Sequence, residues 1–207
     1  MLKMRFFSFA LLAVAAATAG AQETVRIPVA PESQLWIEGT SNLHGWSCKA
    51  TTLDASVFVD STATDLATAV PGALRRVEVK VPVKEIKCDH GGMDGRLQKA
   101  LKADQDPEIS YILASFTTSG ETPDSFTLHA TGRLTVAGVE KPIDFQVEAE
   151  RQKDGSVVAT GTVPILMTAY DVKPPTAMLG MLRTGDQVEV KFNLVIDGHA
   201  HAVAIHH

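Results

Sequence analysis

The chain has 207 residues, of which 45% are hydrophobic and 6% aromatic, and its formal charge is −5. This charge argues against nucleic acid as a partner, because nucleic-acid binding depends on clustered Lys and Arg. The sequence also shows no basic patch for an anionic membrane surface. Any contact with lipid must therefore use apolar surface.

The N-terminus has the three parts of a secretory signal peptide. Lys3 and Arg5 precede an apolar run over residues 6–17, and small residues follow at 19–21. This pattern predicts cleavage after Ala21 and export to the periplasm. The apolar run is shorter than the roughly 20 residues that span a bilayer, so we expect no stable membrane insertion. The remainder predicts one domain over residues 22–198 and a flexible, His-containing tail over residues 199–207.

Alternation of apolar and polar residues dominates the exported part of the chain and predicts a mostly β fold. The clearest strand is the last, where Val188, Val190, Phe192, Leu194 and Ile196 share one face. A helical period occurs convincingly once, at Met93–Lys102. The eight expected strands, in chain order, are 35–40, 53–59, 77–83, 109–116, 126–136, 143–150, 157–167 and 187–196.

The connections between these strands favour antiparallel pairing. Ala137-Gly138 and Asp154-Gly155 are short turn sequences between consecutive strands. No βαβ alternation is present, so a closed antiparallel barrel or a sandwich remains, and the long strands favour the barrel. Pro82 and Pro164 fall inside strand patterns and predict bulges or strand ends. The low aromatic content argues against an outer-membrane barrel.

An eight-stranded barrel is either filled by its own side chains or able to hold one small ligand. Small residues at Ala130, Gly132, Ala159 and Gly161 favour room along the axis, although neighbouring large residues and the helix could fill it. The apolar segment 167–182 fits no strand and is a candidate lid. Its methionines suit contact with a flexible aliphatic chain, but they could equally pack under a long loop.

Two cysteines, Cys48 and Cys88, are the only ones in the chain. In an oxidising compartment an even number favours a disulfide, here closing a loop of about 40 residues that contributes on the order of 4 kcal/mol. An alternative is a metal site, because two imidazoles and two thiolates are a ligand set for zinc. That set would consist of His44, Cys48, Cys88 and His90.

Several stretches, in their order and spacing, are similar to YceI-like proteins. They are Leu35 to Trp46, Ile109-Ser110-Tyr111 with Ala114-Ser115-Phe116, Gly132 to Pro142, and Gly185 to Val190. The resemblance covers nearly all of the exported chain. It implies an all-β, extended, lipocalin-like antiparallel barrel that holds a long polyisoprenoid or similar amphiphile and has no catalytic residues. Cys48 and Cys88 depart from the more common pattern of the family.

These observations favour a periplasmic carrier with a lipid-like ligand, such as an isoprenoid or quinone-like amphiphile, and with no cofactor. The alternative is a structural or metal-bearing interaction module with a filled barrel, and a homodimer is left open. Catalysis is disfavoured, because the chain contains no GxSxG, HExxH or phosphate-binding glycine loop. The predicted ligand-binding residues are Leu35, Ile37, Trp46, Phe126, Leu128, Phe145, Val147, Ile165, Tyr170, Met178, Met181, Phe192 and Leu194.

Overall fold

The computed structural model describes residues 23–63, 65–89, 91–177 and 181–198. The predicted signal peptide and His-containing tail therefore lie outside the described residues, as do His90 and Met178. Within the described part, no helix has both the length and the apolar character needed to cross a membrane.

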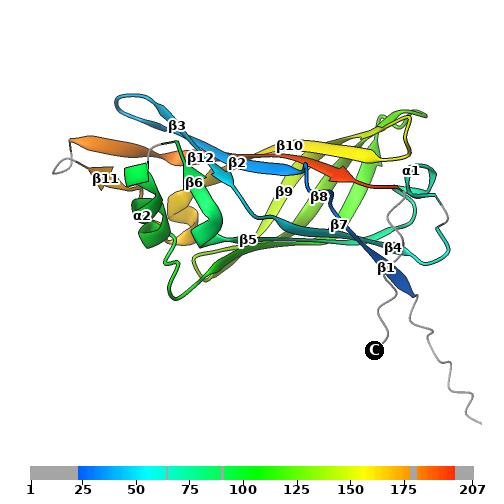
Figure 1. Ribbon diagram of the computed structural model, residues 1–207, viewed down its shortest axis with the longest axis horizontal. Helices are drawn as coiled ribbons and strands as arrows, with labels where there is room; N and C mark the ends of the chain where they lie inside the picture. The colour runs from blue at the N-terminus through cyan, green and yellow to red at the C-terminus, as the bar shows by residue number, and fades with distance from the viewer. Residues whose placement is uncertain (1–22, 64, 90, 178–180, 199–207) are drawn as a thin grey trace, which may run out of the picture.

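The described chain forms one strongly curled antiparallel sheet, elongated along the axis that is horizontal in Figure 1. A two-residue strand, β11 (Thr176–Ala177), adds to the end of β12. The other strands pair in the order β1 (Thr24–Pro28), β4 (Asp54–Asp60), β5 (Leu74–Pro82), β7 (Glu108–Ser119), β8 (Ser125–Val136), β9 (Val139–Arg151), β10 (Val157–Leu166), β12 (Leu182–Ile196), β2 (Gln34–Ser41), β3 (Gly45–Ala50) and β6 (Ile86–Cys88).

The predicted all-β class is confirmed, and each of the eight expected strands is present, but the count of eight was wrong. The structure adds β1, β3, β6 and β11 among the described residues. These strands have two to six residues, too few for alternation to stand out from the surrounding sequence. The expected helix is α2 (Gly91–Ala100), and a one-turn helix, α1 (Leu66–Ala69), was not predicted.

The two edges of the curled sheet meet other strands through short connections. After β1, Val29 forms an isolated antiparallel bridge with Ile196 of β12, and the Ala30 amide donates to the Val195 carbonyl. On the opposite seam, the 3₁₀ turn η1 (Val83–Glu85) carries the chain from β5 to β6, which pairs with β3. These links bring the sheet round into a barrel-like wall.

The inner face of this wall is apolar because alternate residues of each long strand point inward. On β8, Phe126, Ala130 and Leu134 are buried, whereas Thr131 and Arg133 are exposed. The buried residues form two clusters. One lies around Val70 and Phe126 at the end of the barrel covered by α1, and the other lies around Val83 and Leu101 at the end covered by α2. These are called the α1 end and the α2 end below.

The wall is less continuous at the α2 end. Strands β9 and β10 pair only from Val157↔Arg151 to Thr160↔Glu148, although both strands continue well past this ladder. The prediction of a bulge or a strand end at Pro164 was wrong, because Pro164 lies inside β10 and pairs in register with Glu189 of β12. It is accommodated there because it lies four residues beyond the last residue that pairs with β9. Its missing N–H therefore removes no bond to β9. Pro82 is the last residue of β5, as expected.

Candidate ligand cavity

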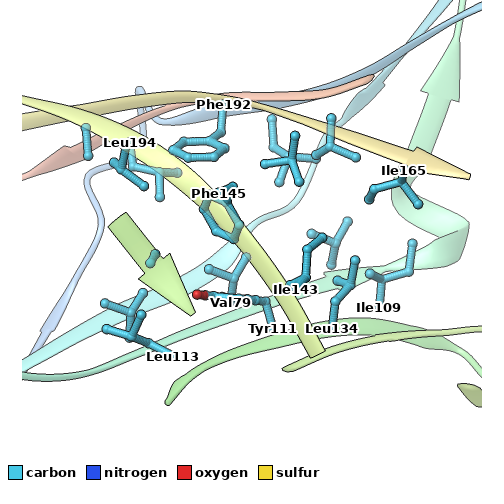
Figure 2. Close-up of a pocket in the computed structure, with 18 of the residues that line it drawn as sticks. Val79, Ile109, Tyr111, Leu113, Leu134, Ile143, Phe145, Ile165, Phe192 and Leu194 are labelled. Atoms are coloured by element: carbon cyan, nitrogen blue, oxygen red, sulfur yellow. The ribbon is translucent and has the colours of Figure 1, made fainter. Parts of the chain in front are cut away.

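An apolar cavity of about 250 Å³ runs along the inside of the barrel. It extends from Leu66 and Val70, next to α1, to Leu97 and Leu101 at the opposite end. No charged residue is among the described side chains that line it. Figure 2 shows its middle section, where aliphatic and aromatic side chains from β5, β7, β8, β9, β10 and β12 converge. Small-molecule sites in proteins are typically concave and mostly apolar in this way.

Most of the side chains predicted to bind a ligand line this cavity. The exceptions are Met181, whose side chain is 68% exposed and outside the lining, and Met178, which is not among the described residues. The predicted residues that line the cavity are Leu35, Ile37, Trp46, Phe126, Leu128, Phe145, Val147, Ile165, Tyr170, Phe192 and Leu194.

The sequence analysis missed other lining residues, including Tyr111 on β7 and Leu97 on α2. Tyr111 was accessible to the same reasoning, because it alternates with Ile109 and Leu113 on one face of a predicted strand. The other tryptophan, Trp36, is outside the lining, and its indole Nε1 donates to Glu38 Oε1 at 3.1 Å.

Three glycines of the wall lie directly beneath aromatic rings from other strands. A Cβ atom at Gly39 would overlap the Trp46 ring, one at Gly132 the Tyr111 ring, and one at Gly161 the Phe192 ring. The glycines were expected to leave room along the axis of the barrel, and the structure shows what this room is for. Each glycine provides room for a ring to lie along the wall, so the ring does not have to project across the cavity.

The aromatic side chains form a row across the middle of the barrel. The ring centroids of Tyr111 and Phe145 are 5.3 Å apart, and those of Phe145 and Phe192 are 6.2 Å apart. The Tyr111 hydroxyl is buried and has no hydrogen-bond partner among the described residues. Burial, and to a lesser degree the charge of Asp144, raises the pKa of Tyr111 to about 12. The hydroxyl is therefore neutral at physiological pH.

Arg151 lies at the α1 end of the barrel, and its side chain is only 12% exposed. Its Nε donates to the Ala67 carbonyl at 2.6 Å, Nη2 to Val70 at 2.9 Å and Nη1 to Thr122 at 2.7 Å. The guanidinium also lies over the Phe126 ring, 4.8 Å from its centroid. One cation thus holds α1 and the turn before β8 against the apolar interior.

The α2 end leads into a second, smaller pocket of about 80 Å³. The two pockets share Trp46, Leu97, Leu101, Met167 and Val172 as lining residues, so they adjoin. Unlike the main cavity, the second pocket also has polar and charged lining residues. These are Ser41, His44, Arg96, Thr176 and Thr184.

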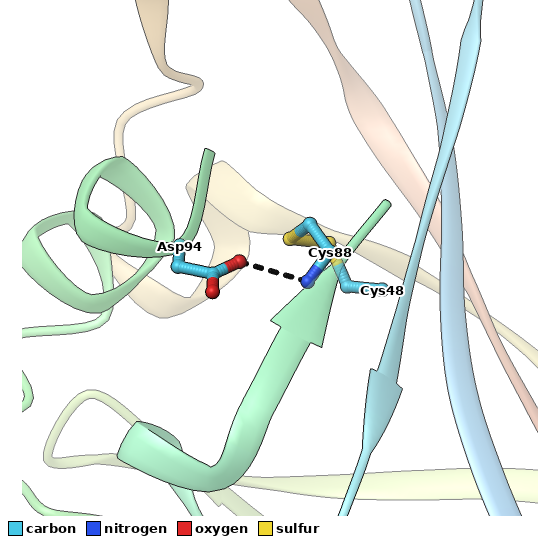
Figure 3. The surroundings of a disulfide bond; sticks show 3 residues. All are labelled: Cys48, Cys88 and Asp94. Atoms are coloured by element: carbon cyan, nitrogen blue, oxygen red, sulfur yellow. Dashed lines mark hydrogen bonds between the residues drawn. A yellow bond between two sulfur atoms is a disulfide. The ribbon is translucent and has the colours of Figure 1, made fainter. Parts of the chain in front are cut away.

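A disulfide joins Cys48 on β3 to Cys88 on β6 at the edge of this second pocket, as the cysteine count predicted. The Cys88 amide donates to Asp94 Oδ1 at 2.8 Å, which ties α2 to β6 (Figure 3). Both thiols that the alternative metal site would need are used in this bond. In this oxidised state Cys48 and Cys88 are therefore not available as thiolate ligands, and the alternative set with His44 and His90 lacks two of its four members.

The described part of the predicted lid contains regular structure. It begins with the 3₁₀ turn η2 (Met167–Tyr170), and Tyr170 and Val172 are buried against the α2-end cluster. Thr168 donates to Asp186 through its amide at 2.8 Å and its hydroxyl at 2.6 Å, and these bonds lower the pKa of Asp186. The expectation that no strand occurs here was wrong, because β11 pairs with β12. Whether the segment moves as a lid stays a prediction.

The fold and the cavity define a class of protein, a small β-barrel built around an apolar interior. The YceI-like domain family matches residues 23–196, so the chain belongs to this family. A comparison with curated proteins finds no match.

Three solved structures share the fold at low sequence identity. Burkholderia cenocepacia BcnA has a TM-score of 0.65 at 16% identity, over 81% of this chain and 98% of that one. A polyisoprenoid-binding domain from Saccharophagus degradans has a TM-score of 0.60 at 14% identity, over 84% and 98% of the two chains. The Campylobacter jejuni YceI protein has a TM-score of 0.53 at 16% identity, over 72% and 83%.

Proposed function

We propose that this protein is a periplasmic binding or carrier protein that holds a polyisoprenoid or similar amphiphilic lipid inside its barrel. One observation carries the proposal: an uncharged, apolar cavity continues from one end of the barrel to the other. Each methylene that leaves water for such an interior contributes about 0.8 kcal/mol, so a long chain would gain enough to be retained. Membership of the YceI-like family and the similarity to a polyisoprenoid-binding domain support this ligand class.

The same observations favour a binding role over catalysis. The cavity offers no nucleophile paired with a base among its described lining residues, and its polar atoms are those of Trp46, Tyr111 and Tyr170. The compartment is supported by the signal-peptide pattern and by the Cys48–Cys88 disulfide, since disulfides persist in oxidising environments. In this proposal the protein takes up a lipid, shields its chain from water and releases it unchanged.

The test is to purify the protein from periplasm without detergent, extract it with organic solvent and identify bound lipid by mass spectrometry. We expect a stoichiometric lipid in the wild type and none after Phe192→Asp or Leu194→Asp, because each places a carboxylate in the cavity. Ile112→Asp is the matched control, since Ile112 is 42% exposed and outside the lining.

Circular dichroism identifies the variants that remain folded. A folded Phe192→Asp protein with the wild-type lipid content would place the ligand elsewhere. An empty wild-type extract, together with failure to take up added farnesol, would contradict the carrier function.

A further inference from the structure

The second pocket, at the α2 end, gives the ligand a direction. We propose that this pocket is a subsite for an anionic oxygen head group, a phosphate or a carboxylate, and that Arg96 is the cation that binds it. This inference rests on the proposed function, because it concerns the polar end of the same amphiphile. In this arrangement the chain lies in the cavity with its tail toward α1, and the head group lies between α2 and the hairpin formed by β11 and β12.

The first argument is the continuity of the two pockets. Trp46, Leu97 and Leu101 line both of them, so the two pockets meet at these side chains, and a molecule in the cavity reaches the second pocket by passing between them. The lining changes character at this boundary, from uncharged to one that includes Arg96 and His44. An amphiphile shows the same change along its length, from an apolar chain to a polar head.

The second argument is that the α1 end offers no comparable place. The guanidinium of Arg151 is directed at the carbonyls of Ala67, Val70 and Thr122 and also pairs with Glu121 at 3.2 Å. Its donors are thus engaged by the protein itself, and its charge is balanced by a carboxylate. A head group at that end would have to displace these bonds, which costs the free energy of several charge-assisted contacts.

The third argument is the chemistry of the second pocket. Among the described residues, no carboxylate forms an ion pair with Arg96, and no carboxylate lines the pocket. The Ser41 hydroxyl is already used, since it donates to the His44 carbonyl and accepts from the His44 amide. The hydroxyls of Thr176 and Thr184 complete the polar lining. Arg96 and these hydroxyl-bearing side chains line the same pocket, and guanidinium and hydroxyl groups are the kinds of donor that an anionic oxygen head group requires.

The disulfide contributes to the same subsite by position. Cys48 and Cys88 line the second pocket, and Asp94 fixes the first turn of α2 to the Cys88 amide. This attachment ties α2, the helix that carries Arg96, to β6 at the second pocket. The only carboxylate of that turn, Asp94, faces β6 through this bond.

The test compares three ligands with the same chain and different head groups: farnesyl phosphate, farnesoate and farnesol. We expect the wild type to bind at least one of the two anions about tenfold more tightly than farnesol, the size of one charge-assisted contact. Arg96→Ala should weaken binding of the preferred anion about tenfold and binding of farnesol less than about twofold, because farnesol has no charge to pair with Arg96, while Arg96→Lys should keep part of the anion preference. Arg133→Ala, which removes a 67%-exposed arginine outside both pockets, should behave as the wild type.

The anion that binds more tightly identifies the head group as a phosphate or a carboxylate. Added salt should weaken the binding of the anions but not the binding of farnesol. Equal affinity for all three ligands in the wild type, or an anion preference that survives in Arg96→Ala, would overturn the subsite while farnesol binding upholds the carrier. If none of the three ligands binds, the carrier function and this inference both fail.

Discussion

The two ends of the barrel are closed by different means. At the α1 end, Arg151 donates to the carbonyls of three residues and so ties α1 to the turn before β8. At the α2 end, the Cys48–Cys88 disulfide and the bond from Cys88 to Asp94 secure the rim without filling the opening. The difference shows that a barrel end can be stabilised by one buried cation that binds several loops, or by attachments at its perimeter, beside which a second pocket remains.

The strand pairing follows the same division. Beside the α1 end, β9 and β10 are joined by their ladder, which ends at Thr160. Beyond Thr160 the two strands no longer pair, and η2 contributes Met167 and Tyr170 to the lining there. The looser wall and the perimeter attachment therefore coincide at the end where the second pocket lies.

The largest expected effect comes from removing the perimeter attachment. The double variant Cys48→Ala with Cys88→Ala should lose about 4 kcal/mol in free energy of unfolding, because the disulfide closes a loop with a sequence separation of 40 residues. Urea denaturation with and without reductant measures this. Reductant should destabilise the wild type to the level of the double variant and leave the double variant unchanged. A loss below about 1 kcal/mol would mean that the rim is held mainly by its other contacts.

The next largest effect should come from the α1 end. Arg151→Ala leaves the carbonyls of Ala67, Val70 and Thr122 without their donor, and we expect a loss of about 3 kcal/mol in free energy of unfolding. Hydrogen exchange should rise around α1 and not around α2. Arg133→Ala, at an exposed ion pair, should cost less than about 0.5 kcal/mol. If the two arginine variants lost the same free energy of unfolding, Arg151 would contribute no more than an exposed ion pair. The α1 end would then not depend on its buried arginine.

Much of the barrel could be predicted from the sequence, because in long strands the alternation of apolar and polar residues is easy to recognise. The inward face of 188–196 correctly placed Phe192 and Leu194 in the cavity, and the even cysteine count gave the disulfide. These features depend on local pattern or on simple pairing. The short strand β6 could not be read in this way, since three residues show no period and its place is set by pairing with β3.

The closure of the two ends could not be read from the sequence at all. Arg151 finds its acceptors 84, 81 and 29 positions away, and nothing in the sequence distinguishes it from the other basic residues. The ring of Phe192 lies over Gly161 only because of the register of β10 and β12. Met181 was predicted to contact ligand, but it is exposed. Its exposure depends on the pairing of β11 with β12, which the sequence does not reveal.

Between the two ends, Tyr111 should make stability depend on alkaline pH. The folded state raises its pKa from 10.0 to about 12, so the neutral form is favoured by folding. Below pH 10 the tyrosine is neutral in both states and its contribution is constant. As pH rises from 10 through 12, the unfolded state loses its proton first, and stability should fall by about 1–2 kcal/mol, allowing for partial exposure.

Tyr111→Phe isolates this effect from other groups that titrate at high pH. At neutral pH the variant should be as stable as the wild type or up to about 1 kcal/mol more stable, because it removes a buried hydroxyl without a partner in the described structure. Between pH 8 and pH 11, urea denaturation should show a smaller loss in the variant than in the wild type. Identical losses would show that the hydroxyl is hydrated in solution.

The smallest expected effect concerns α2, whose sequence is unusually rich in glycine for a helix: Gly91, Gly92 and Gly95. A Cβ atom at Gly95 would meet no other atom within 4 Å, so Gly95→Ala should stabilise the helix by about 0.5–1 kcal/mol. If α2 must shift for a ligand to pass the rim, the variant should bind farnesol with similar affinity but exchange it more slowly, which stopped-flow fluorescence measures. Unchanged exchange rates in the stabilised variant would direct the search for the entry route to the unpaired parts of β9 and β10, because no ladder of hydrogen bonds holds them together there.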